Sequence, residues 1–401
     1  MKRPSPGERP DRGASERLVA LPMDRRRFLV LLGGAATYAT LRPQLALARK
    51  LAQEPAHLQP WRLPEQVPTG NPLEVAKAVI AAAVLAPSHW NTQPWRIEVD
   101  GATLRLYADT RRALPVTDPD QRAMMVSLGA SLENMLIALR AYGLHPTLDY
   151  FPSRHDPSWV ATIGWVPSES VRERLMFTAI PERRTNRRGY DGRGIYPQNR
   201  AALVSQVSSD LTLHWLDERD HLRDVADLVS EAVEAETHDR RSQSEHWAWI
   251  RFGDGAARKS GDGVTMDALE YGGLPHWFAG SYFDPNSAFL RFGAGSAAHK
   301  ARDDVRSAGA LALLTAPRSG DLLRVSAGQS YQRLALRATT LGIAQQLIHA
   351  PISVERFRGD LLRAFGAPGE DPIAFLRLGH ARSPEPSVRR SVAMVASFRN
   401  S

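Results

Sequence analysis

Residues Ala86–Trp95 read APSHWNTQPW, and this stretch decides how the rest of the chain is interpreted. It lies between an apolar run with helical spacing and a run that alternates apolar and polar residues like a strand. Two prolines end the helix and stiffen the turn, while Ser88, Asn91, Thr92 and Gln93 supply small polar groups. A rigid polar turn of this kind can hold the edge of a planar ligand. An ordinary helix-to-strand loop is the alternative, and spacing alone leaves both interpretations open.

The periodicity of apolar residues predicts a mixture of helices and strands, and therefore an α+β fold. In the first block we expect helices over about 72–86 and 122–142, and strands over about 95–99, 103–108, 146–151 and 159–165. In the second block we expect a helix opening at Pro197, helices over about 218–237, 327–347 and 354–365, and strands over about 211–216, 311–315 and 373–378. Between residues 240 and 299 the sequence shows little periodicity.

Two segments of the chain resemble each other. Residues 129–143 and 328–342 both begin and end with glycine, carry serine at the third position and place apolar residues at a helical period. A strand is expected downstream of each segment. A chance match between two core helices is the alternative, but the shared downstream strand favours a degenerate internal duplication.

A compact basic segment opens the second block. Residues 183–188 read RRTNRR, which places four arginines and a hydroxyl within six residues. Guanidinium groups match phosphate oxygens in a bidentate geometry, so this composition suits an anion site. A solvated basic run at a domain junction would have the same composition.

These two motifs resemble those of the nitroreductase superfamily, the FMN-dependent oxidoreductases. Residues 86–95 are similar to its APSxxNxQPW signature, and residues 183–187 to its Arg-Arg-Ser-x-Arg element. The resemblance implies that FMN is the cofactor and that its phosphate is held by Arg183, Arg184, Thr185 and Arg187. It also implies that the flavin ring faces Pro87, Ser88 and Asn91. Gln93 would join them or brace the turn, and Arg389 would lie near the phosphate, with a solvated C-terminal tail as its alternative.

The order of the two motifs departs from the superfamily, where the arginine element comes first. In the homodimeric members each flavin takes its clamp from one subunit and the turn from the other. A chain with the turn in its first block and the clamp in its second resembles such a dimer fused into one polypeptide, as in the Acg branch. We therefore expect a nitroreductase-like fold, one FMN per chain and a monomer that acts as a pseudo-dimer.

The expected activity is two-electron flavin chemistry on an unidentified acceptor, with NAD(P)H as a candidate donor. No catalytic side chain is assigned, since the flavin carries the hydride, and no metal site is expected because the histidines lack ligand spacing. The aromatic, Gly-rich segment 271–285 could form a lid over the flavin or seal the seam between the halves. With a lid, the alternative function is FMN binding or sequestration with little reductase activity.

Charge and composition indicate an N-terminal targeting signal rather than a basic binding face. The formal charge is +8, and seven of these charges fall in residues 1–50, so nucleic acid is not an expected partner. Arg25, Arg26 and Arg27 followed by an apolar run resemble a twin-arginine signal, with cleavage expected near residue 48 and Met23 as a candidate start. We expect export by the twin-arginine machinery to an extracytoplasmic location, or a cytoplasmic protein if the signal is not used. No stable membrane span is expected after cleavage.

The expected organisation has four parts. An extension with the signal covers residues 1–48 and a linker rich in Pro, Gln and Gly covers 49–71. The nitroreductase-like halves are expected over 72–178 and 179–401, the second with a lid-like insertion at about 240–300.

Overall fold

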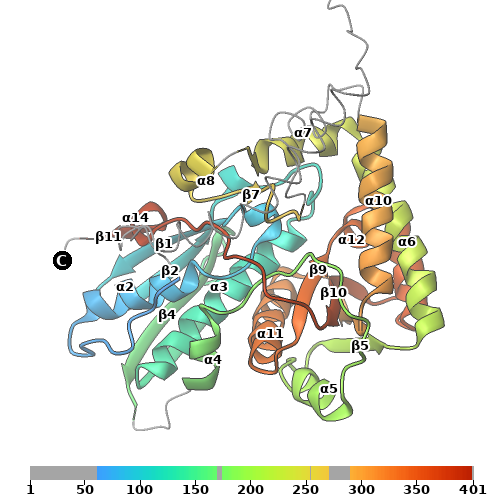
Figure 1. Ribbon diagram of the computed structural model, residues 1–401. Coiled ribbons are helices and arrows are strands. Elements are labelled where there is room, and N and C mark those ends of the chain that lie inside the picture. The colour runs from blue at the N-terminus through green and yellow to red at the C-terminus, as the bar shows by residue number, and fades with distance from the viewer. Residues whose placement is uncertain (1–60, 169–173, 253, 271–289, 400–401) are drawn as a thin grey trace, which may run out of the picture. The chain divides into compact units, whose positions relative to one another are not determined.

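The computed structural model describes residues 61–168, 174–252, 254–270 and 290–399. Helices and β-sheets are both present, which confirms the α+β class. A five-stranded sheet has the order β11-β1-β2-β4-β3, a four-stranded sheet has the order β5-β8-β10-β9, and a small third sheet pairs β6 with β7. Figure 1 shows the long helices α3 and α11 between the two main sheets.

The first half begins with helix α2 (Pro72–Ala83). Asn71 caps this helix because its side chain accepts hydrogen bonds from the amides of Leu73 and Glu74 at 3.1 and 3.4 Å, and Pro72 needs no amide partner there. The remaining elements of this half are η2 (His89–Asn91), β1 (Trp95–Asp100), β2 (Thr103–Ala108), η3 (Thr110–Arg112), α3 (Arg122–Ala141), β3 (Leu144–Tyr150), β4 (Trp159–Pro167) and α4 (Arg174–Ala179).

The second half contains more helices and ends by returning to the first sheet. Its elements are α5 (Pro197–Val204), β5 (Thr212–Leu216), α6 (Arg219–His238), α7 (Arg240–Trp249), β6 (Ile250–Arg251), α8 (Asp254–Ser260), β7 (Val264–Thr265), α10 (Leu290–Arg306), β8 (Ala310–Ala316), α11 (Asp321–Thr340), β9 (Ala344–Ile348), α12 (Ala350–Ser353), α13 (Glu355–Ala364), β10 (Asp371–Gly379), α14 (Val392–Val395) and β11 (Ala396–Phe398). Strand β11 pairs in parallel with β1, so the C-terminal segment lies against the sheet of the first half.

The two main sheets repeat one topology. The order β1-β2-β4-β3 recurs as β5-β8-β10-β9, and every neighbouring pair in both series is antiparallel. Each series carries its long helix at the same place, α3 between β2 and β3 and α11 between β8 and β9. A glycine with positive φ follows each helix, Gly143 at 80° and Gly342 at 67°.

Helices α3 and α11 touch through two glycines that the sequence comparison aligned. A Cβ atom on Gly129 would lie 2.1 Å from the carbonyl oxygen of Val325 and 2.9 Å from the Cα of Gly328. A Cβ atom on Gly328 would lie 2.2 Å from the carbonyl oxygen of Val126 and 2.9 Å from the Cα of Gly129. The contact is thus reciprocal, as at a two-fold axis, and it admits no side chain at either position.

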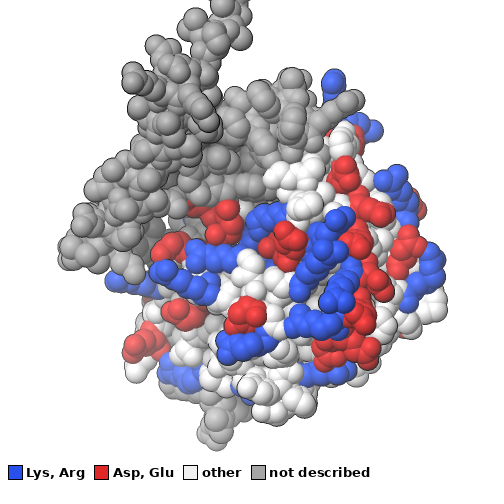
Figure 2. All heavy atoms as spheres, turned by 45° about the vertical axis from the view of Figure 1, so that its right-hand side comes forward, with Lys and Arg blue, Asp and Glu red and all other residues white. Residues whose placement is uncertain are grey.

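A further helical layer covers the other face of the second sheet. Val225 of α6 packs against Leu313 and Phe375 of that sheet within one buried cluster, and α10 runs beside α6 in Figure 1. On the surface, acidic and basic side chains are interspersed over the face that Figure 2 shows. One such group joins Asp227 to Arg302 and Arg306, each at 3.1 Å.

Three sequence expectations need correction. The helix expected over 327–347 is α11, which starts at Asp321 and ends at Thr340, and residues 344–348 form strand β9. Alanine and glutamine favour a helix there, but the positive φ of Gly342 ends the helix. Residues 344–348 then pair with β10 as a strand. The stretch 240–299, in which little periodicity gave no expected element, contains α7, β6, α8, β7 and the first part of α10. Strand β11 was not expected at all.

Two expectations fall on residues that the structure does not describe. The twin-arginine signal, its cleavage site and most of the linker lie before residue 61, and the lid-like segment 271–285 lies within the gap 271–289. Among the described helices, none is both long and apolar enough to cross a membrane.

The glycine contact gives a test of the fold. Gly328→Ala should lower the free energy of unfolding by about 1–3 kcal/mol or more, because the helices must separate to admit a methyl group. Gly359→Ala, at an exposed position of helix α13, should instead be neutral or stabilise by about 0.5–1 kcal/mol. Equilibrium denaturation with urea measures both. Equal effects of the two substitutions would contradict the close contact.

Candidate functional site

The signature turn is held in a strained backbone conformation. Trp90, Asn91 and Gln93 have positive φ angles of 49°, 53° and 51°. Residues with side chains seldom adopt this region, at a cost of about 1–3 kcal/mol each, and do so only where the surroundings enforce it. The turn therefore needs strong external contacts.

Asn91 provides the first set of these contacts. Its Nδ2 donates to the carbonyl oxygens of Gly263 and Val388 at 2.9 and 3.1 Å. Its Oδ1 accepts a hydrogen bond from Arg389 at 3.0 Å. The side chain therefore ties the turn to the residue before strand β7 and to the C-terminal segment, and both of its N–H groups bond to the protein.

Gln93 provides the second set from a fully buried position. Its Nε2 donates to the carbonyl of Gly261 at 2.8 Å, and its Oε1 accepts from the amide of Arg390 at 2.9 Å. The hydroxyl of Ser88 accepts from the amide of Gln93 at 2.9 Å. Of the two roles left open by the sequence, the structure places Gln93 as a brace of the turn.

The arginine segment lies against the same turn, although about ninety residues separate the two in sequence. Arg183 is buried, 2% exposed, and its Nη1 lies 3.4 Å from the hydroxyl of Thr185. Its Nε has no hydrogen-bond partner among the residues that the structure describes. Arg187 donates to the carbonyl of Ala268 at 3.2 Å. Within the described residues, no carboxylate lies within 4.0 Å of Arg183, Arg187 or Arg389.

Among the described residues, these arginines form a cationic cluster without an ion pair to a carboxylate. Glu385 lines the same small pocket and acts on Arg184 from beyond ion-pair distance, as Glu270 does on Arg187. Burial lowers the pKa of Arg183 to about 10, and the charges of Arg184 and Arg187 add to this effect. Burial also lowers the pKa of Arg389 well below its usual range, with further contributions from Arg183 and Arg184. Like charges brought together in a buried place are costly unless an anion compensates them. The cluster is therefore suited to a phosphate group.

All the predicted site residues except Gln93 line one small pocket, of about 40 Å³. Pro87, Ser88 and Asn91 come from the turn, and the arginine segment and Arg389 come from the second half. The turn and the arginine segment therefore line the same pocket. Other lining residues that the sequence did not indicate are Trp61, Val264, Glu385 and Ser387.

Trp61 closes one side of this pocket. Its ring lies under the guanidinium of Arg184 at 4.4 Å and under that of Arg389 at 4.8 Å. The indole Nε1 donates to the carbonyl oxygen of Ser387 at 2.9 Å. Sequence reasoning missed Trp61 because it falls in the expected linker, where a single tryptophan in polar surroundings was the only signal.

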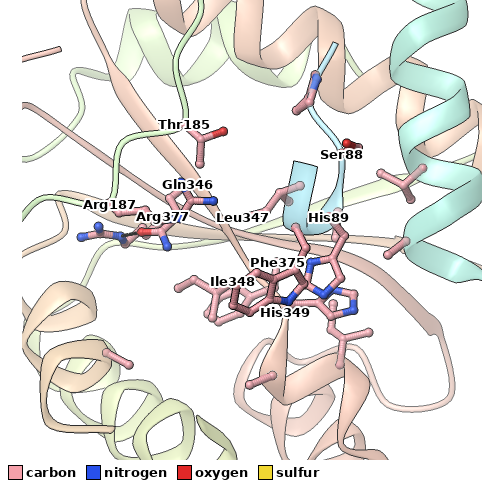
Figure 3. Close-up of a pocket in the computed structure, with 18 of the residues that line it drawn as sticks. Ser88, His89, Thr185, Arg187, Gln346, Leu347, Ile348, His349, Phe375 and Arg377 are labelled. Carbon is pink, nitrogen blue, oxygen red and sulfur yellow. Dashed lines mark hydrogen bonds between the residues drawn. The ribbon is translucent and has the colours of Figure 1, made fainter. Parts of the chain in front are cut away.

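A larger cavity of about 250 Å³ adjoins the small pocket. The two share Pro87, Ser88, Thr185, Arg187 and Val264. Figure 3 shows the polar side chains of Arg187, Arg377 and Gln346 at one end of the cavity. The rings of His89 and His349 lie at the other end, with Ile348 and Phe375 nearby. A basic pocket therefore continues into a space with largely apolar walls.

Two histidines from distant segments, His89 and His349, line this cavity, and a third, His246, stacks on the lining residue Trp90. The rings of His89 and His349 lie 3.9 Å apart between centroids, and His246 stacks on Trp90 at 4.3 Å. Burial lowers the pKa of each, that of His246 to about 3, so all three are uncharged near neutral pH. Because these histidines lie far apart in the sequence, their spacing did not predict that they would be close in space. In the described ranges, no set of three or more His, Asp or Glu side chains is arranged to hold a metal ion.

Comparison with known proteins places this geometry in context. No family model matches the chain. It is 29% identical over 337 residues to the "Putative NAD(P)H nitroreductase Rv3131" of Mycobacterium tuberculosis, covering 81% of this chain and 92% of that protein. It is 36% identical over 116 residues to the "Putative NAD(P)H nitroreductase acg" of the same organism, covering 28% and 35%.

Among solved structures, a nitroreductase with bound FMN from Bacteroides fragilis aligns at a TM-score of 0.33 and 14% identity, over 54% of this chain and 96% of that one. The sequence similarity to Rv3131 extends over most of both chains. This similarity supports the expected place of the chain in the nitroreductase superfamily.

Proposed function

We propose that the chain is an FMN-dependent oxidoreductase of the nitroreductase type. The observation that carries this proposal is the small basic pocket that continues into a larger apolar cavity, both built on the strained turn. A phosphate needs the first environment and a flat aromatic ring needs the second. The names of the relatives, NAD(P)H nitroreductases, support the same class of activity.

The residues present fit an FMN phosphate. Arg183 has a buried Nε without a partner, and Thr185 and Arg389 line the same pocket. We assign the phosphate to these three residues together with Arg187, since charge-assisted hydrogen bonds from them would compensate the cationic cluster. FMN, when bound, supplies two-electron hydride chemistry, and the protein contributes binding, orientation and exclusion of water.

The repeated topology supports a further proposal, that the chain is a fused pseudo-dimer with a single flavin. The aligned glycines Gly129 and Gly328 meet reciprocally, and the two sheets share one strand order. The second half has no counterpart of the APSxxNxQPW turn, and residues 61–71 contain no arginine cluster. The two motifs therefore combine into a site once per chain.

NAD(P)H is the proposed electron donor, and the acceptor is not identified. A sequestering role, with an occluded flavin, remains the competing function. Mixing the FMN-loaded protein with NADPH in a stopped-flow instrument separates the two. An oxidoreductase loses the absorbance of oxidised flavin rapidly, whereas a sequestering protein keeps it until dithionite is added.

We also propose that the chain is exported by the twin-arginine machinery, on the basis of the three arginines at 25–27 and the apolar run that follows. This route carries folded proteins and suits one that acquires its cofactor in the cytoplasm. Replacement of Arg25 and Arg26 by Lys should retain the protein in the cytoplasm.

The phosphate assignment predicts how two arginines affect cofactor affinity. Arg183→Ala and Arg187→Ala should each weaken FMN binding roughly 10- to 100-fold, because a charge-assisted hydrogen bond contributes about 1.5–3 kcal/mol. Riboflavin lacks the phosphate, so its affinity should not change in either variant. Fluorescence titration measures both ligands.

Arg193→Ala serves as the control, because Arg193 is exposed and pairs only with Asp191 in the described part of the chain. A loss of riboflavin affinity equal to that of FMN would show that the phosphate lies elsewhere.

The position of Trp61 predicts a kinetic effect. Trp61→Ala should speed FMN dissociation roughly 5- to 30-fold, since two cation–π contacts of about 0.5–1 kcal/mol each are lost and the pocket opens. Trp61→Phe should keep FMN dissociation close to the rate of the unchanged protein, because a phenylalanine ring still stacks on the two guanidinium groups. Trp215, which also stacks on an arginine, Arg200 at 5.3 Å, is the matched control. If Trp215→Ala and Trp61→Ala behave alike in a stopped-flow dissociation assay, Trp61 does not close the pocket.

A further inference from the structure

One part of the larger cavity is not used by the proposed phosphate site. Glu236, near the end of helix α6, lines the larger cavity but not the small pocket. Its Oε1 accepts a hydrogen bond from the hydroxyl of Ser353, the last residue of α12, at 2.6 Å. Its Oε2 has no hydrogen-bond partner among the described residues. Among the described residues, one oxygen is therefore held by a hydrogen bond and the other has no such contact.

The surroundings of Glu236 are apolar or acidic. Val229 and Val233 of the same helix and Ile352 of α12 line the cavity with it. The charged groups that act on its carboxyl are Glu245 of α7 and Asp239 at the start of that helix. In the described part of the chain no cation compensates this carboxyl. Burial and the two acidic neighbours raise the pKa of Glu236 to about 7, against the opposing hydrogen bond from Ser353.

The remaining titratable groups of the cavity leave this end uncharged. His89 and His349 line the cavity and are neutral because burial lowers the pKa of each, and burial does the same to His246 behind the lining residue Trp90. From α10 the cavity receives Asp304, which pairs with Lys300 at 2.7 Å and with Arg377 at 3.7 Å. The part of the cavity with Arg187 and Arg377 thus carries positive charge, whereas the part with Glu236 carries none.

We propose that Glu236, in its acid form, donates a hydrogen bond from Oε2 to an uncharged ligand oxygen, such as a carbonyl oxygen, bound at this end of the cavity. Ser353 positions the carboxyl by donating to Oε1, so the proton stays on Oε2. Apolar walls, and the lack of a compensating cation among the described residues, reject carboxylates and phosphates from this end. This inference rests on the proposed function in so far as the ligand is the redox partner of the flavin.

The site should follow the protonation of Glu236. Below about pH 6 the carboxyl carries its proton and can donate, whereas above about pH 8 it is an anion that repels a carbonyl oxygen. Glutamine at this position keeps an N–H donor at every pH. Ser353→Ala removes a hydrogen bond that favours the anion, so it should move the loss of binding to higher pH.

The test is a calorimetric titration of the FMN-loaded protein with menadione, a neutral quinone, and with 2-naphthoate, an anion of similar size. Menadione affinity should fall roughly tenfold between about pH 6 and about pH 8, and 2-naphthoate should bind weakly throughout. Glu236→Gln should remove the pH dependence, while Glu234→Gln, an exposed position on the same helix, should leave it intact. Menadione binding that is independent of pH in the unchanged protein, or 2-naphthoate binding of equal strength, would overturn the proposal.

A second measurement does not depend on the flavin. Because the pKa of Glu236 is higher in the folded than in the unfolded protein, the folded state binds more protons between about pH 4.5 and 7, and stability falls as pH rises through this window. Glu236→Gln should therefore match the unchanged protein near pH 4.5, and at pH 8 its unfolding equilibrium constant should be lower than that of the unchanged protein by up to about 300-fold. An equal effect of the substitution at both pH values would mean that Glu236 is not held as an acid.

These two measurements also separate this inference from the proposed function. A protein that fails to bind FMN still yields the unfolding result, which reports on Glu236 without the flavin.

Discussion

The contact of α3 with α11 at Gly129 and Gly328 is the constraint on which the rest of the structure depends. Because neither helix presents a side chain at the crossing, their backbones meet, and the sheets attached to them are fixed relative to one another. This contact brings the turn of the first half to the arginine segment of the second. A bulkier residue at either glycine would separate the two parts of the site.

A second constraint refines the first. The turn adopts a costly backbone conformation, and the side chains of Asn91 and Gln93 hold it against residues 261–263 and 388–390. The C-terminal segment therefore has two roles, since Arg389 also lines the small pocket. Strain at the turn is balanced by contacts from elements that are distant in sequence, which links the geometry of the site to completion of the whole fold.

Local patterns predicted much of this arrangement. The prolines and polar residues of 86–95 indicated the turn, and the density of arginines in 183–187 indicated an anion site, because both signals are contained within a few residues. Trp61, Glu236 and the three histidines carry no such signal, since their meaning comes from neighbours far along the chain. Strand β9 escaped prediction for the same reason: its residues favour a helix locally, and only its pairing with β10 makes it a strand.

The central claim is that turn and clamp form one flavin site within a single chain. A crystal structure of the protein with FMN tests it most directly. The account predicts one FMN per chain, with its phosphate among Arg183, Thr185, Arg187 and Arg389 and its ring in the cavity beside Pro87 and Ser88. A phosphate bound elsewhere, or a second FMN in the same chain, would contradict it.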